Sequence, residues 1–230
     1  MKSLFIVPSC ISFSPEIPLD YSDSRSAFSP EERFEQSLDT IASIRRYSPT
    51  SAIMFVEISY LTSKHKEILT KKCEHVISPD QRSVRIFDHF KDHANKSHGE
   101  TFLILQALNA LKTLQYPAYD LFFKLSGRYK INSDFKIENY VNNLFVAKKH
   151  YGFDSSSAIY TTLFSFSKDF FDLFWLNILW SFSVTTNYLP PYKGYSLETN
   201  ILPHSSKDIT FIDTLGVEGK IGPSGTLETS

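Results

Sequence analysis

Cysteine is scarce in this sequence, with only Cys10 and Cys73 among its 230 residues. The two lie far apart and have neither metal-binding nor redox spacing, which excludes a disulfide framework and predicts a reducing, cytoplasmic compartment. No segment approaches the roughly 18–20 apolar residues that a membrane span needs. The apolar run at the N-terminus contains Pro8 and no small-residue cleavage site, so it predicts a first strand rather than a signal peptide.

An excess of charge of either sign is also missing, because the formal net charge is −1. This balance excludes the basic footprint of a nucleic-acid-binding domain. The chain is 42 % hydrophobic and 21 % charged, which is typical of a globular domain with a proper core. Aromatic residues make up 15 % of it. Most of them are expected in the core, although flat side chains also line sites that hold sugars or bases.

The first half of the chain alternates between strand-like and helix-like segments. Ser29, Pro30 and Glu32 form the start signal of a helix that is predicted to run to about Tyr47, and a second amphipathic helix is predicted to begin near Gly99. A polar helical segment is expected over residues 61–73. Apolar runs of strand length lie at 4–11, 52–59, 74–78 and 119–127. This alternation predicts an α/β fold with a mainly parallel, doubly wound sheet flanked by helices.

The second half is richer in aromatic residues and less regular. It contains an apolar run at 157–167, a helix at 169–180, a Pro- and Tyr-rich loop at 187–195, a short helix start at 196–202 and a hairpin-like tail at 209–222. No internal repeat appears. We predict one domain over residues 1–230, with the second half built around the edge of the first.

Three segments, at 24–59, 95–111 and 122–132, together resemble the GT-A class of nucleotide-sugar glycosyltransferases. The third, "FFKLSGRYKIN", is similar to the strand end at which GT-A enzymes carry a metal-binding Asp-x-Asp motif, with Lys124 and Asn132 in register. Here the acidic triplet is replaced by Ser126-Gly127-Arg128. The stretch from Lys124 to Tyr129 also resembles a subgroup with K-[ST]-G-R-Y at this place. The resemblance implies a GT-A-like, Rossmann-like fold with a nucleotide-sugar-binding half at 1–132 and an acceptor half at 133–230.

The departure from Asp-x-Asp makes chemical sense if Arg128 stabilises the leaving phosphate. A guanidinium offers five donors and a permanent charge, and two unit charges about 4 Å apart interact by about 4 kcal/mol at an effective dielectric near 20. Gly127 would allow a close backbone approach or a positive φ, and Ser126 would hydrogen-bond a phosphate or a sugar hydroxyl. We therefore expect no cofactor and no required metal. The alternative is that Arg128 pairs with a carboxylate and Gly127 is only a turn.

Other positions match places where GT-A enzymes hold the donor. The competing interpretation is a solvated surface arginine for Arg33 and a simple strand-end carboxylate for Glu57. For Lys96, His98 and Gly99 it is a solvated charged loop. The helix N-terminus near Gly99 also suits an anion by itself, because its amides are unpaired. The further substrate-binding candidates are Ser9, Arg25, Arg33, Glu57, Lys96, His98, Gly99, Lys124 and Tyr129.

An inverting transferase needs a base for the acceptor hydroxyl. The resemblance implies a late acidic residue at a short helix start, which is Glu198 here, and Asp154 is the second candidate. An ordinary first-turn glutamate is the alternative for Glu198. His204 is expected to be a loop residue rather than a metal ligand. His89 and His93 have i, i+4 spacing, for which a charged helix face is favoured over a zinc site.

The resemblance thus implies transfer of a sugar from a nucleotide donor to a surface polysaccharide, lipopolysaccharide or capsule glycan. The expected acceptor is a glycan or a lipid-linked glycan, the latter with peripheral contact at the inner face of the membrane. Three alternatives stay open: an inactive nucleotide-sugar-binding partner protein, a transferase using a phosphosugar donor without a nucleotide, and a structural interaction protein.

Overall fold

The computed structural model describes residues 1–19, 22–114, 118–151, 158–187, 196–201, 208–220 and 224–230, the side chains of 184–187 excepted. The strands are β1 (Ser3–Ser9), β2 (Ala52–Glu57), β3 (His75–Ile77), β4 (Leu121–Leu125), β5 (Tyr129–Ile131), β6 (Phe145–Ala147), β7 (Leu163–Ser167), β8 (Ile209–Phe211), β9 (Val217–Lys220) and β10 (Leu227–Thr229). The α-helices are α1 (Pro30–Tyr47), α2 (Ser63–Lys72), α3 (Val84–Lys91), α4 (Lys96–Thr113), α5 (Phe171–Asn187) and α6 (Leu197–Asn200). Short 3₁₀ turns occupy Ile137–Asn139 and Lys168–Phe170.

Seven strands form the main sheet, in the order β3-β2-β1-β4-β7-β6-β8. The first four are mutually parallel, β7 is antiparallel to both of its neighbours, and β6 and β8 are parallel. A second sheet has three antiparallel strands in the order β10-β9-β5. Its strand β5 comes directly after β4 in the chain, and β9 and β10 come from the C-terminal end. The predicted α/β class, with a mainly parallel sheet flanked by helices, is confirmed.

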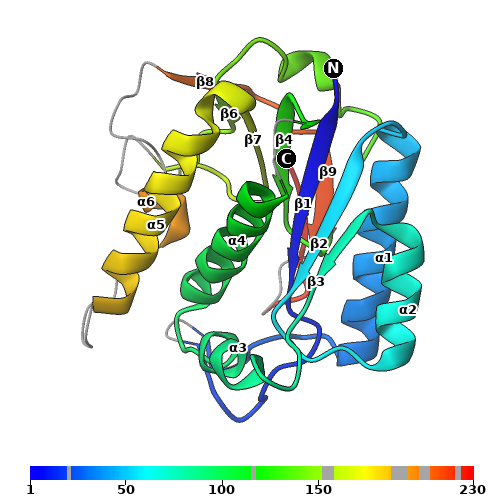
Figure 1. Ribbon diagram of the computed structural model, residues 1–230, viewed down its shortest axis with the longest axis vertical. Coiled ribbons are helices and arrows are strands. Elements are labelled where there is room, and N and C mark those ends of the chain that lie inside the picture. The colour runs from blue at the N-terminus through cyan, green and yellow to red at the C-terminus, as the bar shows by residue number, and fades with distance from the viewer. Residues whose placement is uncertain (20–21, 115–117, 152–157, 188–195, 202–207, 221–223) are drawn as a thin grey trace.

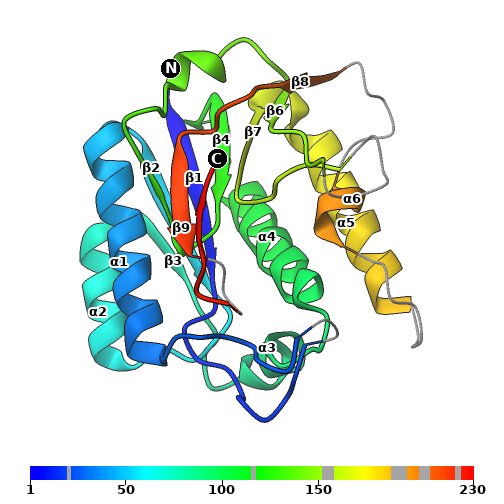
Figure 2. The ribbon, with the colours of Figure 1, turned by 180° about the vertical axis from the view of Figure 1, so that it is seen from behind.

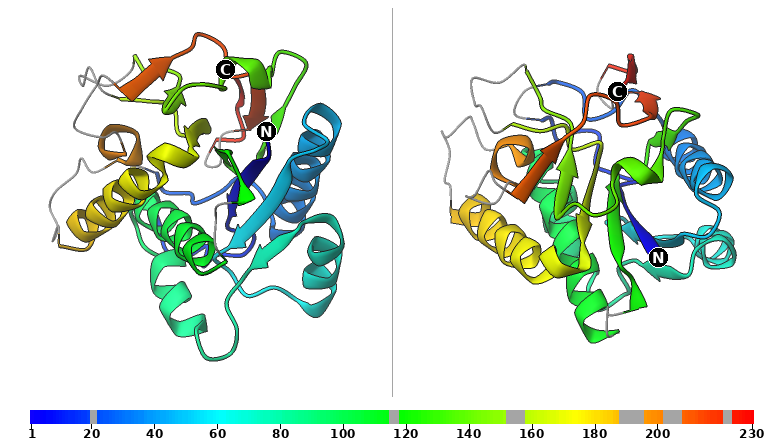
Figure 3. Two further views of the ribbon diagram at one scale, coloured as in Figure 1. Left: turned by 45° about the horizontal axis from the view of Figure 1, so that its top comes forward. Right: turned by 90° about the horizontal axis from the view of Figure 1, so that it is seen from above.

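Helices cover the main sheet on both faces (Figures 1 and 3). Along β1 the side chains alternate, with Leu4 and Ile6 in the core beneath α4 and α5, and Phe5 and Val7 in the core beneath α1. Because both faces are buried, the strand reads as a continuous apolar run rather than an alternating one. The N-terminal strand expected from the sequence is therefore the centre of the fold.

The capping box that predicted α1 is present in full. Ser29 Oγ accepts from the backbone N–H of Glu32 at 3.2 Å, and Glu32 Oε2 accepts from the backbone N–H of Ser29 at 2.8 Å, with Pro30 as the first helical residue. These contacts satisfy two amides that the first helical turn would otherwise leave unpaired. The helix start is thus fixed at the edge of the sheet where β1 ends.

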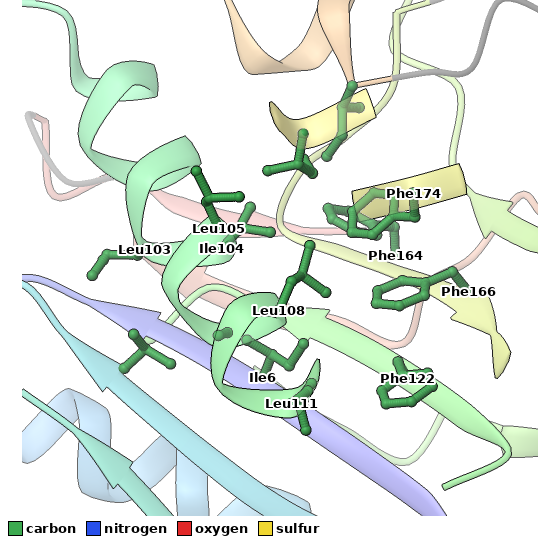
Figure 4. Packing of buried hydrophobic residues seen from close by; sticks show 14 of the residues in the cluster. Ile6, Leu103, Ile104, Leu105, Leu108, Leu111, Phe122, Phe164, Phe166 and Phe174 are labelled. Carbon is green, nitrogen blue, oxygen red and sulfur yellow. The ribbon is translucent and has the colours of Figure 1, made fainter. Parts of the chain in front are cut away.

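Phenylalanines fill the core between α4, α5 and the sheet. The rings of Phe122 and Phe166 stack with centroids 5.1 Å apart, and those of Phe166 and Phe174 with centroids 4.2 Å apart. Figure 4 shows these side chains facing Leu108 of α4. The aromatic richness of the chain is therefore used largely for packing in this layer.

One local prediction was wrong, and one helix start is shifted. The tail at 209–222 was expected to be a hairpin, but β8 joins β6 in the main sheet while β9 joins β5 and β10 in the small sheet. The helix expected near Gly99 begins at Lys96, where Asn95 caps it by accepting from the amide of Ser97 at 3.0 Å. None of the described helices is long and apolar enough to cross a membrane.

Candidate anion-binding site

The candidate site lies at the carboxyl edge of the main sheet, between β1 and β4. Both α1 and α4 begin at this edge and run back along opposite faces of the sheet, as Figures 1 and 2 show. In open α/β sheets, ligands bind in the crevice outside the carboxyl ends of the strands. The turn after β4, from Ser126 to Tyr129, lies at this position.

Gly127 brings this turn against the end of β1. Its amide donates to Pro8 O at 3.0 Å, and a Cβ built on Gly127 would lie 3.0 Å from Pro8 O and 3.1 Å from Ser9 Cβ. The φ angle of Gly127 is not positive, so the glycine is required for the close approach rather than for an unusual backbone conformation. The amides of Arg128 and Tyr129 then both donate to Ser126 O, at 2.8 and 2.9 Å. The turn thereby fixes where the Arg128 side chain starts.

Three cationic side chains from separate elements meet here: Arg33 in the first turn of α1, Lys96 at the first residue of α4, and Arg128 after β4. Burial, and then the charge of Arg33, lowers the pKa of Arg128 to about 10. Burial, and then the charge of Arg128, lowers the pKa of Lys96 to about 7, with Arg33 contributing in the same direction. The three charged groups therefore interact electrostatically through a poorly solvated region.

None of these three side chains has an ion pair or a hydrogen bond from its charged group within the described part of the chain. Arg33 Nε and Arg128 Nη1 are buried without a partner, and the Arg33 guanidinium lies over the Phe13 ring at 5.2 Å from its centroid. Buried charges are normally paired, so an unpaired cluster of one sign indicates a site for an anion.

Lys124 lies beside this cluster on β4 and is completely buried. Its Nζ donates to Glu100 Oε1, to Thr161 O, and to Ser126 Oγ at 2.8 Å. Burial opposes ionisation of Glu100, but the charge and hydrogen bond of Lys124 outweigh it and hold the pKa of that carboxyl below its ordinary value. Lys124 and Glu100 are thus a charged pair beneath the cluster.

Glu198, the predicted base, connects to this pair from the second half of the chain. Its Oε1 accepts from Thr161 Oγ1 at 3.0 Å, and the carbonyl of Thr161 is the one that Lys124 binds. The backbone carbonyl of Glu198 accepts from the amide of Ile159 at 3.0 Å. One polar chain therefore runs from Glu198 through Thr161 and Lys124 to Glu100.

Ser9 and Glu57, at the ends of β1 and β2, are buried behind the site. Glu57 Oε1 accepts from the amides of Ile11 and Ser59, at 2.9 and 2.8 Å, while its Oε2 is buried without a partner. Burial raises the pKa of Glu57 against these hydrogen bonds. Ser9 Oγ lies 3.3 Å from Ser37 Oγ. Glu57 thus holds the chain after β1 in position, and Ser9 joins the end of β1 to α1.

Arg25, His98 and Gly99 contact groups other than the cationic cluster. Arg25 donates to the carbonyls of residues 91, 92 and 93 at 2.8–3.4 Å, which ties its loop to the end of α3. His98 is 2 % exposed and stacks on Phe182, and burial lowers its pKa to about 4. A Cβ on Gly99 would lie 2.9 Å from Phe90 O, so this glycine allows α3 and α4 to pack closely.

The remaining candidates are placed as follows. Tyr129 begins β5, and its hydroxyl donates to Glu228 Oε2 on β10. Burial, and then this hydrogen bond, raises the pKa of Tyr129. His89 lies in the last turn of α3, whereas His93 lies beyond the helix. No group of three or more His, Cys, Asp or Glu side chains able to hold a metal ion occurs among the residues that the structure describes. Asp154 and His204 lie outside the described residues.

Glu100 and Thr161 were not singled out from the sequence. A signal for Glu100 was present, because it aligns with Ile104, Leu108 and Leu111 on the sheet-facing side of α4. A lysine in a central strand, such as Lys124 in "LFFKL", also requires a buried partner. No comparable pattern marks Thr161.

No protein-family model and no curated protein matches the chain. Solved structures similar to it include a glycosyltransferase involved in glycosylation of the major capsid of PBCV-1, with a TM-score of 0.47, 14 % identity, and coverage of 92 % of this chain and 82 % of that one. The nucleoside-diphosphate-sugar pyrophosphorylase from Vibrio cholerae RC9 has a TM-score of 0.45 and 10 % identity, with coverage of 85 % of this chain and 85 % of that one. HddC from Yersinia pseudotuberculosis has a TM-score of 0.43 and 13 % identity, with coverage of 95 % of this chain and 93 % of that one. At TM-scores below 0.5 these likenesses carry no conclusion about the function of the chain.

Proposed function

We propose that the chain is a glycosyltransferase of the GT-A type, which moves a sugar from a nucleotide-sugar donor to a surface polysaccharide or a related glycan. The observation that carries this proposal is the gathering of Arg33, Lys96 and Arg128, unpaired, at the carboxyl edge of the α/β sheet. A diphosphate is the part of such a donor that this cluster suits.

Charge and geometry both favour a phosphate ligand. Each cation about 4 Å from a phosphate oxygen would contribute about 4 kcal/mol at an effective dielectric near 20, against the cost of desolvating both groups. Arg128 would stabilise the negative charge that grows on the leaving phosphate as its bond to the anomeric carbon breaks. We propose that this happens without a required metal, since a guanidinium occupies the strand end where the GT-A resemblance implies carboxylates.

Glu198 is the proposed base for the acceptor hydroxyl. Its carboxylate is oriented by Thr161, which precedes β7, and the helix α6 that carries Glu198 contacts α4. Glu198 thus lies in the half proposed to hold the acceptor. Asp154 is the alternative base. With a lipid-linked acceptor, the protein would act at the cytoplasmic face of a membrane.

A nucleotide screen tests the proposal most directly. Thermal unfolding should shift upward with at least one of UDP, GDP, CMP and dTDP, and the shift should disappear in Arg128→Ala. Arg85→Ala, an exposed arginine on α3, is the matched control and should keep it. Stabilisation by sugar phosphates without a base would favour the phosphosugar-donor alternative, and none by any anion would favour an interaction protein.

Turnover separates an enzyme from an inactive binding partner. Slow hydrolysis of the stabilising nucleotide sugar is expected from the isolated protein, and it should be lost in Arg128→Ala. The same rate is expected with EDTA. A collapse in EDTA that Mn²⁺ reverses would contradict the metal-independent mechanism, whereas donor binding without turnover would support the partner-protein alternative.

A further inference from the structure

Lys96 and Glu100 lie four residues apart on the first turns of α4. Opposite charges at this spacing face each other on a helix and ordinarily attract. No ion pair joins them in the described structure, because Glu100 Oε1 is taken by Lys124 Nζ from the strand beneath. The carboxylate that acts electrostatically on both Lys96 and Arg128 is therefore held by a residue that does not belong to the cluster.

The contact between Lys124 and the Glu100 carboxylate is largely buried. The Lys124 side chain has no exposed surface, while the Glu100 side chain retains 21 %. Two further acceptors, Ser126 Oγ and Thr161 O, fix the ammonium group in place. Ser126 Oγ is also 3.3 Å from Glu100 Oε1, so a hydroxyl and an ammonium both hold the same oxygen.

We propose that Lys124 is a positioning residue whose task is to hold Glu100 back from Lys96 and Arg128, so that both keep their charge available for an anion. This inference rests on the anion-binding part of the proposed function. Without Lys124, the nearest cations for the Glu100 carboxylate are the two groups that influence it already, Lys96 and Arg128. The carboxylate would then compete with the anion as an internal ligand.

The test measures binding of inorganic pyrophosphate by isothermal titration calorimetry, so it does not depend on sugar transfer. Lys124→Met should weaken binding by about tenfold, as expected for a carboxylate brought next to two binding cations. Adding Glu100→Gln should restore the affinity of the double variant to within about twofold of the wild type. Lys130→Met is the matched control, because Lys130 lies two residues after Arg128 but pairs with Glu218; it should change affinity by less than about twofold.

A direct effect of the Lys124 charge makes a different prediction. In that case Lys124→Met would weaken binding equally in the wild-type and the Glu100→Gln background, and this additive result would overturn the inference. Equal binding by Lys124→Met and the wild type would also overturn it. If Lys124→Met alone does not fold, Glu100→Gln is compared with the double variant, and a tenfold difference between these two would overturn it. A wild-type protein that does not bind pyrophosphate would refute the anion site itself.

Discussion

Lys96 should give the protein a pH-dependent folding stability that methionine in its place removes. Burial, together with the charges of Arg128 and Arg33, lowers the pKa of Lys96 to about 7 in the folded chain, from an ordinary value of 10.5. The unfolded chain keeps this proton up to about pH 10. Between these two values the unfolded state binds more protons than the folded state, so the free energy of unfolding rises as pH rises.

The size of the effect follows from the two pKa values. Above the folded-state pKa, the Lys96 contribution to the free energy of unfolding rises by nearly 1.4 kcal/mol per pH unit. At pH 7 about half of the folded molecules still carry the proton, so integration from pH 7 to pH 9 gives about 2 kcal/mol. Lys96→Met lacks this titration. The wild type should therefore gain about 2 kcal/mol relative to the variant over this range.

Urea unfolding of both proteins at pH 7, 8 and 9 measures this gain. Comparing the two proteins cancels the contributions of groups that they share and that Lys96 does not influence, such as Tyr129, whose pKa burial raises. Lys66→Met, at an exposed lysine of α2, should keep a constant difference from the wild type. A wild-type minus Lys96→Met difference that changes by less than about 0.5 kcal/mol between pH 7 and pH 9 would refute the reasoning.

An anion bound at the cluster should reverse the lowering of the Lys96 pKa. Pyrophosphate beside Lys96 would favour the charged ammonium and raise its pKa again. At pH 8, binding should then take up close to one proton. Calorimetry in two buffers of different ionisation enthalpy measures this uptake, and the Lys96→Met variant should show less of it.

Other predictions follow from single contacts. Gly127→Ala should lower the free energy of unfolding by about 1–3 kcal/mol, because the new methyl group lies 3.0 Å from Pro8 O, and unchanged stability would contradict the close approach. Phe122→Ala should lower it by about 3–5 kcal/mol by opening a cavity against the aromatic core, as measured by urea unfolding. Ser29→Ala should cost about 1 kcal/mol through loss of the cap of α1, whereas Ser29→Asp should largely keep stability. Glu198→Gln should abolish sugar transfer while leaving nucleotide affinity within about twofold; a variant that keeps its rate would exclude Glu198 as the base.

Local signals in the sequence were enough for most of the first half. Apolar runs of strand length, the Ser29–Glu32 capping box and the periodicity of α4 depend on neighbours within a few residues, so they can be read without the fold. The same is true of the break after β4, where Gly127 and Arg128 interrupt an apolar strand. The sequence by itself therefore determined the α/β class and the strand end at which a functional site should lie.

Only the tertiary structure decided which strands pair and which charges meet. Backbone hydrogen bonds are the same for every residue, so the sequence did not reveal that β7 runs antiparallel beside β4 or that β8 and β9 separate into different sheets. The charges of Arg33, Lys96 and Arg128 come together because α1, α4 and β4 share one edge of the sheet, although the residues are far apart in the chain. Likewise, helix spacing alone pairs Glu100 with Lys96, and it is the buried strand beneath that gives the carboxylate to Lys124 instead.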